Sequence, residues 1–213
     1  GCVNDTFSFE VTRPELIEIS SIDSTAATCY NADNGSITLS ASGGTGNLEF
    51  SIGNPLDYKD VGQTFTSLPA DSTYNITVRD DSLCSVSATA TITEPDSMYI
   101  TYVDSTHILC NGSNDGTISI ATTGGSVPYT FNLEQSSVYI ANQSSNDTTT
   151  FTGLAGGKYY VDIQDDNGCP VVRSDSILIN EPPGIEVDST NNPAISCYGD
   201  STNLITYAQG GSG

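Results

Sequence analysis

The chain has 213 residues, of which 26 are acidic and 5 are basic, and its formal net charge is −21. Such an acidic chain repels nucleic-acid phosphates and anionic membrane headgroups, so charge-driven binding to either is excluded. Only 15% of the residues are charged, which argues against a charge-rich disordered tail, and no apolar run approaches the roughly 18 residues that span a membrane.

Three stretches of the chain repeat the same landmarks in the same order. Each begins with a cysteine, continues with a segment of alternating apolar and polar residues, and ends in a Gly-Gly pair. The cysteines lie 81 and then 87 residues apart, and the landmarks are Cys29 with Gly43-Gly44, Cys110 with Gly124-Gly125, and Cys197 with Gly210-Gly211. Further landmarks recur in pairs: Phe65 to Leu68 with Phe151 to Leu154, Tyr74 with Tyr159, Asp80-Asp81 and Cys84 with Asp165-Asp166 and Cys169, and Glu94-Pro95 with Glu181-Pro182.

These landmarks divide the chain into two complete modules, residues 15–96 and 97–183. Residues 1–14 are interpreted as the last strand of a preceding repeat, and residues 184–213 as the first strands of a following one. Since no signal peptide or initial Met opens the sequence, we expect a window on a longer array. Short Glu-Pro junctions, stiffened by proline, predict an elongated and semi-rigid rod.

Each module has the pattern of about seven short strands. In the second module they are predicted at 98–109, 116–123, 128–133, 137–142, 148–152, 158–164 and 170–180. Period-two alternation bounded by Gly, Asn and Asp supports these strands, and nothing of helical period and length appears. The pattern predicts an all-β fold of tandem immunoglobulin-like sandwiches. Tyr159 and Tyr74 stand where such folds place a corner tyrosine, although both also suit a core aromatic position.

The segment from Cys110 to Phe131, with Gly124-Gly125 and Pro128-Tyr129, resembles the repeat of giant gliding-motility surface adhesins of Bacteroidota, the SprB-type repeat. The run from Asp165 to Cys169 and the terminal Glu-Pro resemble the rest of that repeat, so the resemblance covers essentially the whole chain. The first module departs from the pattern where Gly43 to Leu48 replaces the Pro-Tyr. The resemblance implies secretion by the type 9 route and display on a cell-surface fibre.

Six cysteines in a chain of this composition predict disulfides. Zinc is disfavoured, because no Cys-x-x-Cys spacing occurs and the single His107 cannot complete such a site. In an immunoglobulin-like sandwich, the first and last hairpins lie at opposite poles, farther apart than the Cα limit of about 7 Å. We therefore expect an inter-module bridge, Cys29–Cys169. Pairing within modules, Cys29–Cys84 and Cys110–Cys169, is the alternative.

On the inter-module hypothesis, the other four cysteines pair with modules beyond this sequence. These are Cys2, Cys84, Cys110 and Cys197. Such bridges would make the rod resist unfolding under tension, because neighbours could not separate without breaking a covalent bond.

Acidic residues gather at the predicted module junctions. Asp80, Asp81, Asp165 and Asp166 are the clearest cases. Because Asp is an ordinary turn former, solvated turns are the favoured interpretation. Calcium, which takes six to eight oxygen ligands, is the second interpretation, although no EF-hand loop is present.

Aspartate is repeatedly followed by Ser or Thr and then by Thr, Leu, Met or Ile. The middle residues are Ser24, Ser72, Ser82, Ser97, Ser105, Thr148, Ser176, Ser189 and Ser201. This triplet resembles the O-glycosylation acceptor of Bacteroidota, which implies covalently attached glycans. Turn chemistry is the alternative explanation.

No catalytic constellation is evident, because any triad would rest on His107 alone, so the chain is predicted not to be an enzyme.

The leading function is a structural stalk or fibre segment of a secreted, extracellular adhesin. Its partners would be neighbouring repeats of the same long chain, covalent glycans and, by lateral packing into filaments, other chains. The alternative is a carbohydrate-binding module, in which exposed Tyr58, Tyr99 or Tyr160 would replace the missing Trp.

Overall fold

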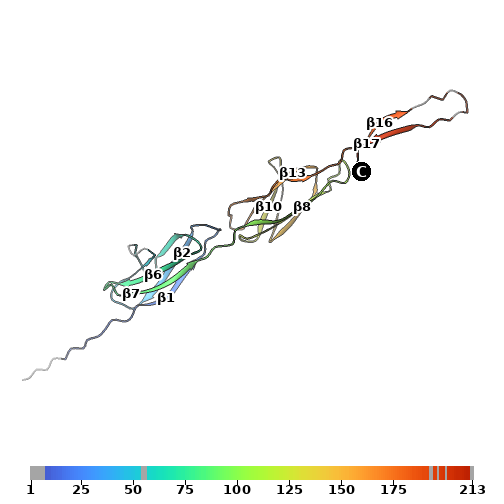
Figure 1. Ribbon diagram of the computed structural model, residues 1–213. Helices are drawn as coiled ribbons and strands as arrows, with labels where there is room; N and C mark the ends of the chain where they lie inside the picture. Colours follow the sequence, from blue (N-terminus) through green and yellow to red (C-terminus); the bar gives the residue numbers. More distant parts are fainter. Residues whose placement is uncertain (1–7, 54–56, 192–193, 196, 200, 212–213) are drawn as a thin grey trace, which may run out of the picture. The chain divides into compact units, whose positions relative to one another are not determined.

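The computed structural model describes residues 8–53, 57–191, 194–195, 197–199 and 201–211, and every regular element in these ranges is a β-strand (Figure 1). They hold no helix long and apolar enough to cross a membrane. Contacts within the chain define two compact units, Gly1–Pro95 and Asp96–Gly213. Each unit contains one complete sandwich.

The first module contains seven strands in two sheets. The strands are β1 (Glu18–Thr25), β2 (Gly35–Ser42), β3 (Leu48–Ile52), β4 (Lys59–Asp60), β5 (Thr64–Leu68), β6 (Ser72–Asp80) and β7 (Ser85–Ile92). One sheet has the order β1-β2-β5 and the other the order β4-β3-β6-β7, and every pairing is antiparallel. The third strand forms although the first module lacks the Pro-Tyr of the second.

The second module repeats this topology. Its strands are β8 (Tyr99–Thr106), β9 (Gly116–Thr123), β10 (Tyr129–Gln135), β11 (Val138–Ser145), β12 (Thr148–Leu154), β13 (Gly157–Gln164), β14 (Val172–Arg173) and β15 (Ile177–Ile179). The sheets have the orders β12-β9-β8 and β11-β10-β13-β14, and β15 also pairs with β13. Both modules are therefore sandwiches of the immunoglobulin-like kind, as the alternation predicted.

The last predicted strand of the second module, residues 170–180, is in fact two short pieces. Ser174 interrupts the strand, because its buried side-chain hydroxyl takes the place of a backbone carbonyl as a hydrogen-bond acceptor for the neighbouring strand. Its Oγ accepts a hydrogen bond from the Val161 N–H at 2.9 Å and donates one to the Asp175 carbonyl. A polar side chain that substitutes for backbone leaves no signal in hydrophobic periodicity, so the sequence pattern missed the break.

The core of each module is built from the inward-facing positions of alternating strands. In β2, Ile37 and Leu39 are fully buried, and in β13 Val161 and Ile163 are fully buried. Phe50 packs edge-on against Phe65 across the first sandwich, with ring centroids 5.0 Å apart. Because the side-chain period of a strand is two, this burial fixes the strand register.

Tyr74 and Tyr159 are corner tyrosines. The Tyr159 hydroxyl donates to the Ala155 carbonyl at 3.0 Å, and the Tyr74 hydroxyl donates to the Pro69 carbonyl at 2.9 Å. Both bonds reach back a few residues to the preceding corner, which is the geometry of a tyrosine corner. Burial raises the pKa of Tyr159 above its ordinary value.

Beyond the second sandwich, β16 (Glu186–Asn191) and β17 (Ile205–Gln209) form an antiparallel hairpin. Its register shift between Val187 and Ser189 recurs in the first hairpins of both complete modules. The hairpin thus has the pattern of the first two strands of a module. The interpretation of residues 1–14 and 184–213 as parts of neighbouring repeats stays a prediction.

Candidate functional site

The chemistry-bearing residues of each module gather at its two ends. The near pole of a module is defined here by the Gly-Gly turn and the turn before its last strand, which carries Cys84 or Cys169. The far pole is defined by the loop after the first strand, which carries Cys29 or Cys110. Both modules use the same contacts at each pole, so the poles are the candidate sites for joining modules.

At the near pole, the Gly-Gly turn closes on the segment that enters the module. The N–H of Gly44 donates to the Glu15 carbonyl at 3.0 Å, and that of Gly125 donates to the Asp96 carbonyl at 2.7 Å. The same bond recurs a third time, from Gly211 to Pro183 at 2.9 Å. This repeated bond explains why the Gly-Gly pair recurs in the sequence.

A buried carboxylate holds the second loop of the near pole. Asp80 is 4% exposed and accepts hydrogen bonds from the N–H groups of Thr45, Ser82 and Cys84, each at 2.9 Å. The carboxylate thus connects the Gly-Gly turn to the cysteine-bearing turn. It satisfies three backbone donors that would otherwise be costly to bury.

The second module repeats this arrangement with Asp165, which is 6% exposed. Its carboxylate accepts from Ser126 N–H at 3.0 Å and from Cys169 N–H at 2.8 Å. The Asp165 side chain lies so close to Gly125 that a Cβ added to this glycine would clash with the carboxylate. The sequence showed the Asp-Asp pair but not that the first aspartate is buried and the second exposed.

At the far pole, the glutamate of the Glu-Pro junction holds the cysteine-bearing loop. Glu94 Oε2 accepts from Asn31 N–H at 2.5 Å, and Glu181 Oε1 accepts from Gly112 N–H at 2.7 Å. Asn31 and Gly112 each stand two residues after the loop cysteine. The sequence pattern indicated a stiff junction at Glu-Pro and, for the acidic residues at the junctions, solvated turns or calcium ligands. The recurrence of the Glu in both modules was the signal that could have shown this role.

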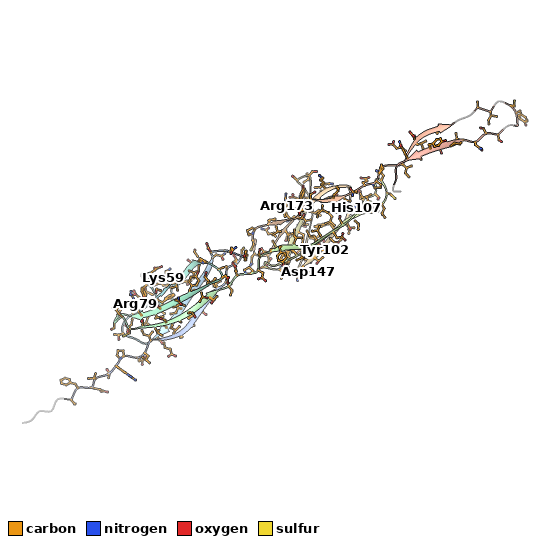
Figure 2. The ribbon with its side chains drawn as sticks, viewed as in Figure 1. Lys59, Arg79, Tyr102, His107, Asp147 and Arg173 are labelled. Atoms are coloured by element: carbon orange, nitrogen blue, oxygen red, sulfur yellow. The ribbon has the colours of Figure 1, made fainter. Side chains whose placement is uncertain are left out.

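His107 supports the same pole of the second module. The N–H of Asn180 donates to His107 Nδ1 at 3.2 Å, and the Ile108 N–H donates to the Asn180 carbonyl at 2.9 Å (His107 is labelled in Figure 2). His107 is exposed and lies just after β8, outside the strand although it falls within the predicted range 98–109, and it holds the end of the last strand by this hydrogen bond.

The two poles of one module lie at opposite ends of its last strand. Cys84 immediately precedes β7, and the segment after β7 reaches the far pole through Glu94. The eight residues of β7 extend about 26 Å at roughly 3.3 Å per residue. A disulfide needs Cα atoms within about 7 Å. Cys29 and Cys84 are therefore too far apart to bond within the folded first module.

The cysteines are found in two states. Cys29 and Cys169 are disulfide-bonded. Free, exposed thiols are found at Cys84, Cys110 and Cys197. Cys2 lies outside the described residues. Neither intra-module pair is formed, because each would require one of the free thiols. The bridge from Cys29 to Cys169 stays a prediction.

No group of three or more His, Cys, Asp or Glu side chains able to share a metal ion is found within the described ranges. Asp80 and Asp165 direct their carboxylates at backbone N–H groups instead, which is the role of a turn-forming aspartate. Calcium binding at Asp80, Asp81, Asp165 and Asp166 remains a prediction without a specific supporting contact.

The Asp-Ser/Thr triplets lie mostly on the surface. The exposed middle residues are Ser24, Ser82, Ser97, Thr148, Ser176 and Ser201. Ser72 and Ser105 are half-buried, and the side chain of Ser189 lies outside the described residues. Ser176 lies within the break between β14 and β15. Glycosylation at these positions stays a prediction.

Two of the tyrosines considered for sugar binding are engaged by arginines. The Arg79 guanidinium lies 3.5 Å from the ring centroid of Tyr58 and pairs with Glu49 at 2.9 Å. Figure 2 labels Arg79 on the first module. Arg173 lies 5.7 Å from the Tyr160 centroid. Tyr58 and Tyr160 are thus partly covered, and Tyr99 is the exposed member of the three.

Arg173 also forms ion pairs with the surrounding acids, at 2.6 Å to Asp162 and at 2.8 Å to Glu134. The hydrogen bond and charge of Asp162 raise the pKa of the Arg173 guanidinium further above its ordinary value. Arg79 and Arg173 thus serve local pairing on the sheets.

Comparison with known proteins agrees with the fold. A family model, the SprB repeat, matches residues 21–56 and 103–138. No curated protein matches the chain. The chain is similar to a structure of the three N-terminal domains of the bacteriophage RB49 Highly Immunogenic Outer Capsid protein (Hoc), with a TM-score of 0.50 and 15% identity, over 92% of this chain and 69% of that one. It is also similar to the N-terminal eight Ig domains of Down Syndrome Cell Adhesion Molecule (DSCAM), with a TM-score of 0.36 and 15% identity, over 79% and 24%.

The sheet topology and the likeness to Hoc define the class: this is a protein of tandem immunoglobulin-like β-sandwiches. Each of its two complete modules contains a segment that matches the SprB repeat, as the resemblance in the sequence predicted. The matched segments start within the first strand of each module and extend past its third strand.

Proposed function

We propose that the chain is a stalk segment of a large, secreted, cell-surface adhesin or extracellular filament of the Bacteroidota type. In this role the modules are non-catalytic spacers, exported by the type 9 route and used in gliding motility. They extend as a rod from the cell and carry an adhesive part elsewhere in the protein.

The observation that carries the proposal is the identity of the pole contacts in successive modules. Asp80 and Asp165 hold the near-pole cysteines, and Glu94 and Glu181 hold the far-pole loops, by equivalent bonds. A module whose two ends are alike from copy to copy suits repeated end-to-end joining. A catalytic centre would instead need convergent groups that differ from the repeat.

We further propose that successive modules are covalently joined, with the far-pole cysteine of one bonded to the near-pole cysteine of the next. Cys29–Cys169 is the pair within this chain. Support comes from the disulfide-bonded state of both residues and from the separation of the poles within a module. Disulfides also suit an extracellular location, where they persist.

The proposed pairing predicts one cross-linked peptide pair. The purified chain is alkylated without reduction, digested and analysed by mass spectrometry. We expect Cys29 linked to Cys169, and alkyl groups on Cys84, Cys110 and Cys197. A Cys29–Cys84 or Cys110–Cys169 peptide would refute the inter-module bridge, and the Cys29→Ser variant, which should release an alkylatable Cys169, serves as the control.

A further inference from the structure

The outer face of the sheet β12-β9-β8 is covered by hydroxyl groups. Ile118 and Ile120 of β9 are fully buried, so the alternating Thr117 and Ser119 face outward. Their hydroxyls pair with those of the neighbouring strands, Thr117 with Thr106 at 2.8 Å and Ser119 with Thr150 at 2.9 Å. The face is therefore polar and regular.

Two tyrosines lie on the same face of the sheet, because a β-bulge in β8 shifts the alternation of side chains between its two faces. Tyr99 and Tyr102 are three residues apart and would face opposite sides of a regular strand. The register shift between Ile100 and Tyr102 inserts one extra residue, so that Tyr99 pairs with Thr123 and Tyr102 with Ala121. Bulges commonly redirect side chains in this way.

Both tyrosine rings are open to solvent. Tyr99 is 57% exposed and Tyr102 is 50% exposed. Their partners on β9 are two residues apart, which spaces the rings by about 7 Å along the sheet. The Tyr102 hydroxyl donates to Asp104 Oδ2 at 3.1 Å, which orients its ring. Figure 2 labels Tyr102 on the second module.

The first module has the same bulge without the aromatic residues. Its register shift lies between Ile19 and Ser21, and Glu18 pairs with Ser42 while Ser21 pairs with Ser40. Glu18 and Ser21 thus occupy the positions of Tyr99 and Tyr102. The sandwich does not require tyrosine at either position, so the exposed pair has no structural explanation in the fold.

The face has the chemistry of a sugar-binding surface. A sugar ring presents apolar C–H groups that pack on an aromatic ring, and hydroxyls at its edge that need hydrogen-bond partners, such as Asp104 and the Ser and Thr rows. No Lys or Arg occurs in β8, β9 or β12, and the net charge of −21 repels acidic polymers. An uncharged glycan therefore fits and an acidic one does not.

We propose that the outer face of the sheet β12-β9-β8 binds an uncharged polysaccharide, with Tyr99 and Tyr102 as the stacking residues. The proposal goes beyond the stalk function and does not depend on it. A stalk whose module also bound glycan would contribute to adhesion along its length.

The test measures binding of the full chain to insoluble β-1,4-glucan, β-1,3-glucan, β-1,4-mannan and agarose, with alginate as the acidic polymer. The protein is produced without glycans, because Thr148 lies on the same face. We expect saturable binding to at least one neutral polysaccharide. The variant Tyr99→Ala/Tyr102→Ala should weaken that binding by about tenfold or more, with an unchanged urea midpoint. Tyr99→Phe/Tyr102→Phe, which keeps both rings, should retain most of it.

The first module provides the matched control. Glu18→Ala/Ser21→Ala should leave binding unchanged, whereas Glu18→Tyr/Ser21→Tyr should add a second site and raise the bound amount at saturation. The proposal is overturned if none of the four neutral polysaccharides retains the chain, if the double alanine variant binds as well as the parent, or if alginate binds equally.

Discussion

Replacing Gly124 by alanine is expected to lower the free energy of unfolding of the second module by about 3 kcal/mol or more. Gly124 has φ +80°, a conformation that favours glycine, and an added Cβ would overlap the carbonyl oxygen of Ser97. That carbonyl belongs to backbone, which cannot move aside as a flexible side chain would. Urea unfolding of the variant and the parent measures the difference.

Gly168 provides the matched control for this prediction. It also has a positive φ, +72°, but nothing lies within 4 Å of an added Cβ. Gly168→Ala should therefore cost only about 1 kcal/mol, the cost of the backbone conformation alone. Equal losses of unfolding free energy for the two variants would show that the close approach of Gly124 to the Ser97 carbonyl does not contribute to stability.

Replacing Asp165 by alanine is the second large expected effect, a loss of roughly 3 kcal/mol. The change leaves the N–H groups of Ser126 and Cys169 without their acceptor in a buried site. Bonds to a charged group contribute more than neutral ones, and an unsatisfied buried donor carries its own cost. Denaturant unfolding under non-reducing conditions measures the loss.

The neighbouring Asp166 is the control, because its side chain is exposed. Asp166→Ala should change the free energy of unfolding by no more than about 0.5 kcal/mol. A similar loss for both variants would contradict the view that Asp165, and not Asp166, organises the near pole of the second module.

Much of the fold follows from local sequence patterns. Alternation in segments such as 158–164, with Gly and Asn at the turns, predicted the strands to within a few residues. The repeat of landmarks predicted that both modules would share one topology. For Tyr74 and Tyr159 the corner role was one of the two roles that the sequence left open, the other being a core aromatic position.

The features that local patterns missed depend on tertiary contacts. The burial of Asp80 and Asp165 follows from two loops meeting, and the role of Glu94 from a loop more than sixty residues earlier in the chain. The bulge that aligns Tyr99 with Tyr102 appears only when the strand is paired. Composition and periodicity describe one segment at a time, so they could not place these side chains together.

Resistance to tension is the central claim of the stalk proposal, and the strand order explains why a covalent bond matters. The first and last strands of each sandwich are not paired with one another in the ladders of the two described modules. Pulling on the chain ends would therefore load the ladder that joins each terminal strand to its own sheet, and no ladder joins the two terminal strands directly. A bridge from Cys29 to Cys169 would carry the force past residues 30–168, so that this part of the chain could not extend.

Single-molecule pulling from the two chain ends tests this claim most directly. About 140 residues lie between Cys29 and Cys169, so at roughly 3.5 Å per residue the fully unfolded chain should be about 490 Å shorter before reduction than after it. An unfolded length that is the same before and after reduction would contradict the covalent junction. Shortening by about 190 or 210 Å would instead indicate a Cys29–Cys84 or Cys110–Cys169 bridge within a single module.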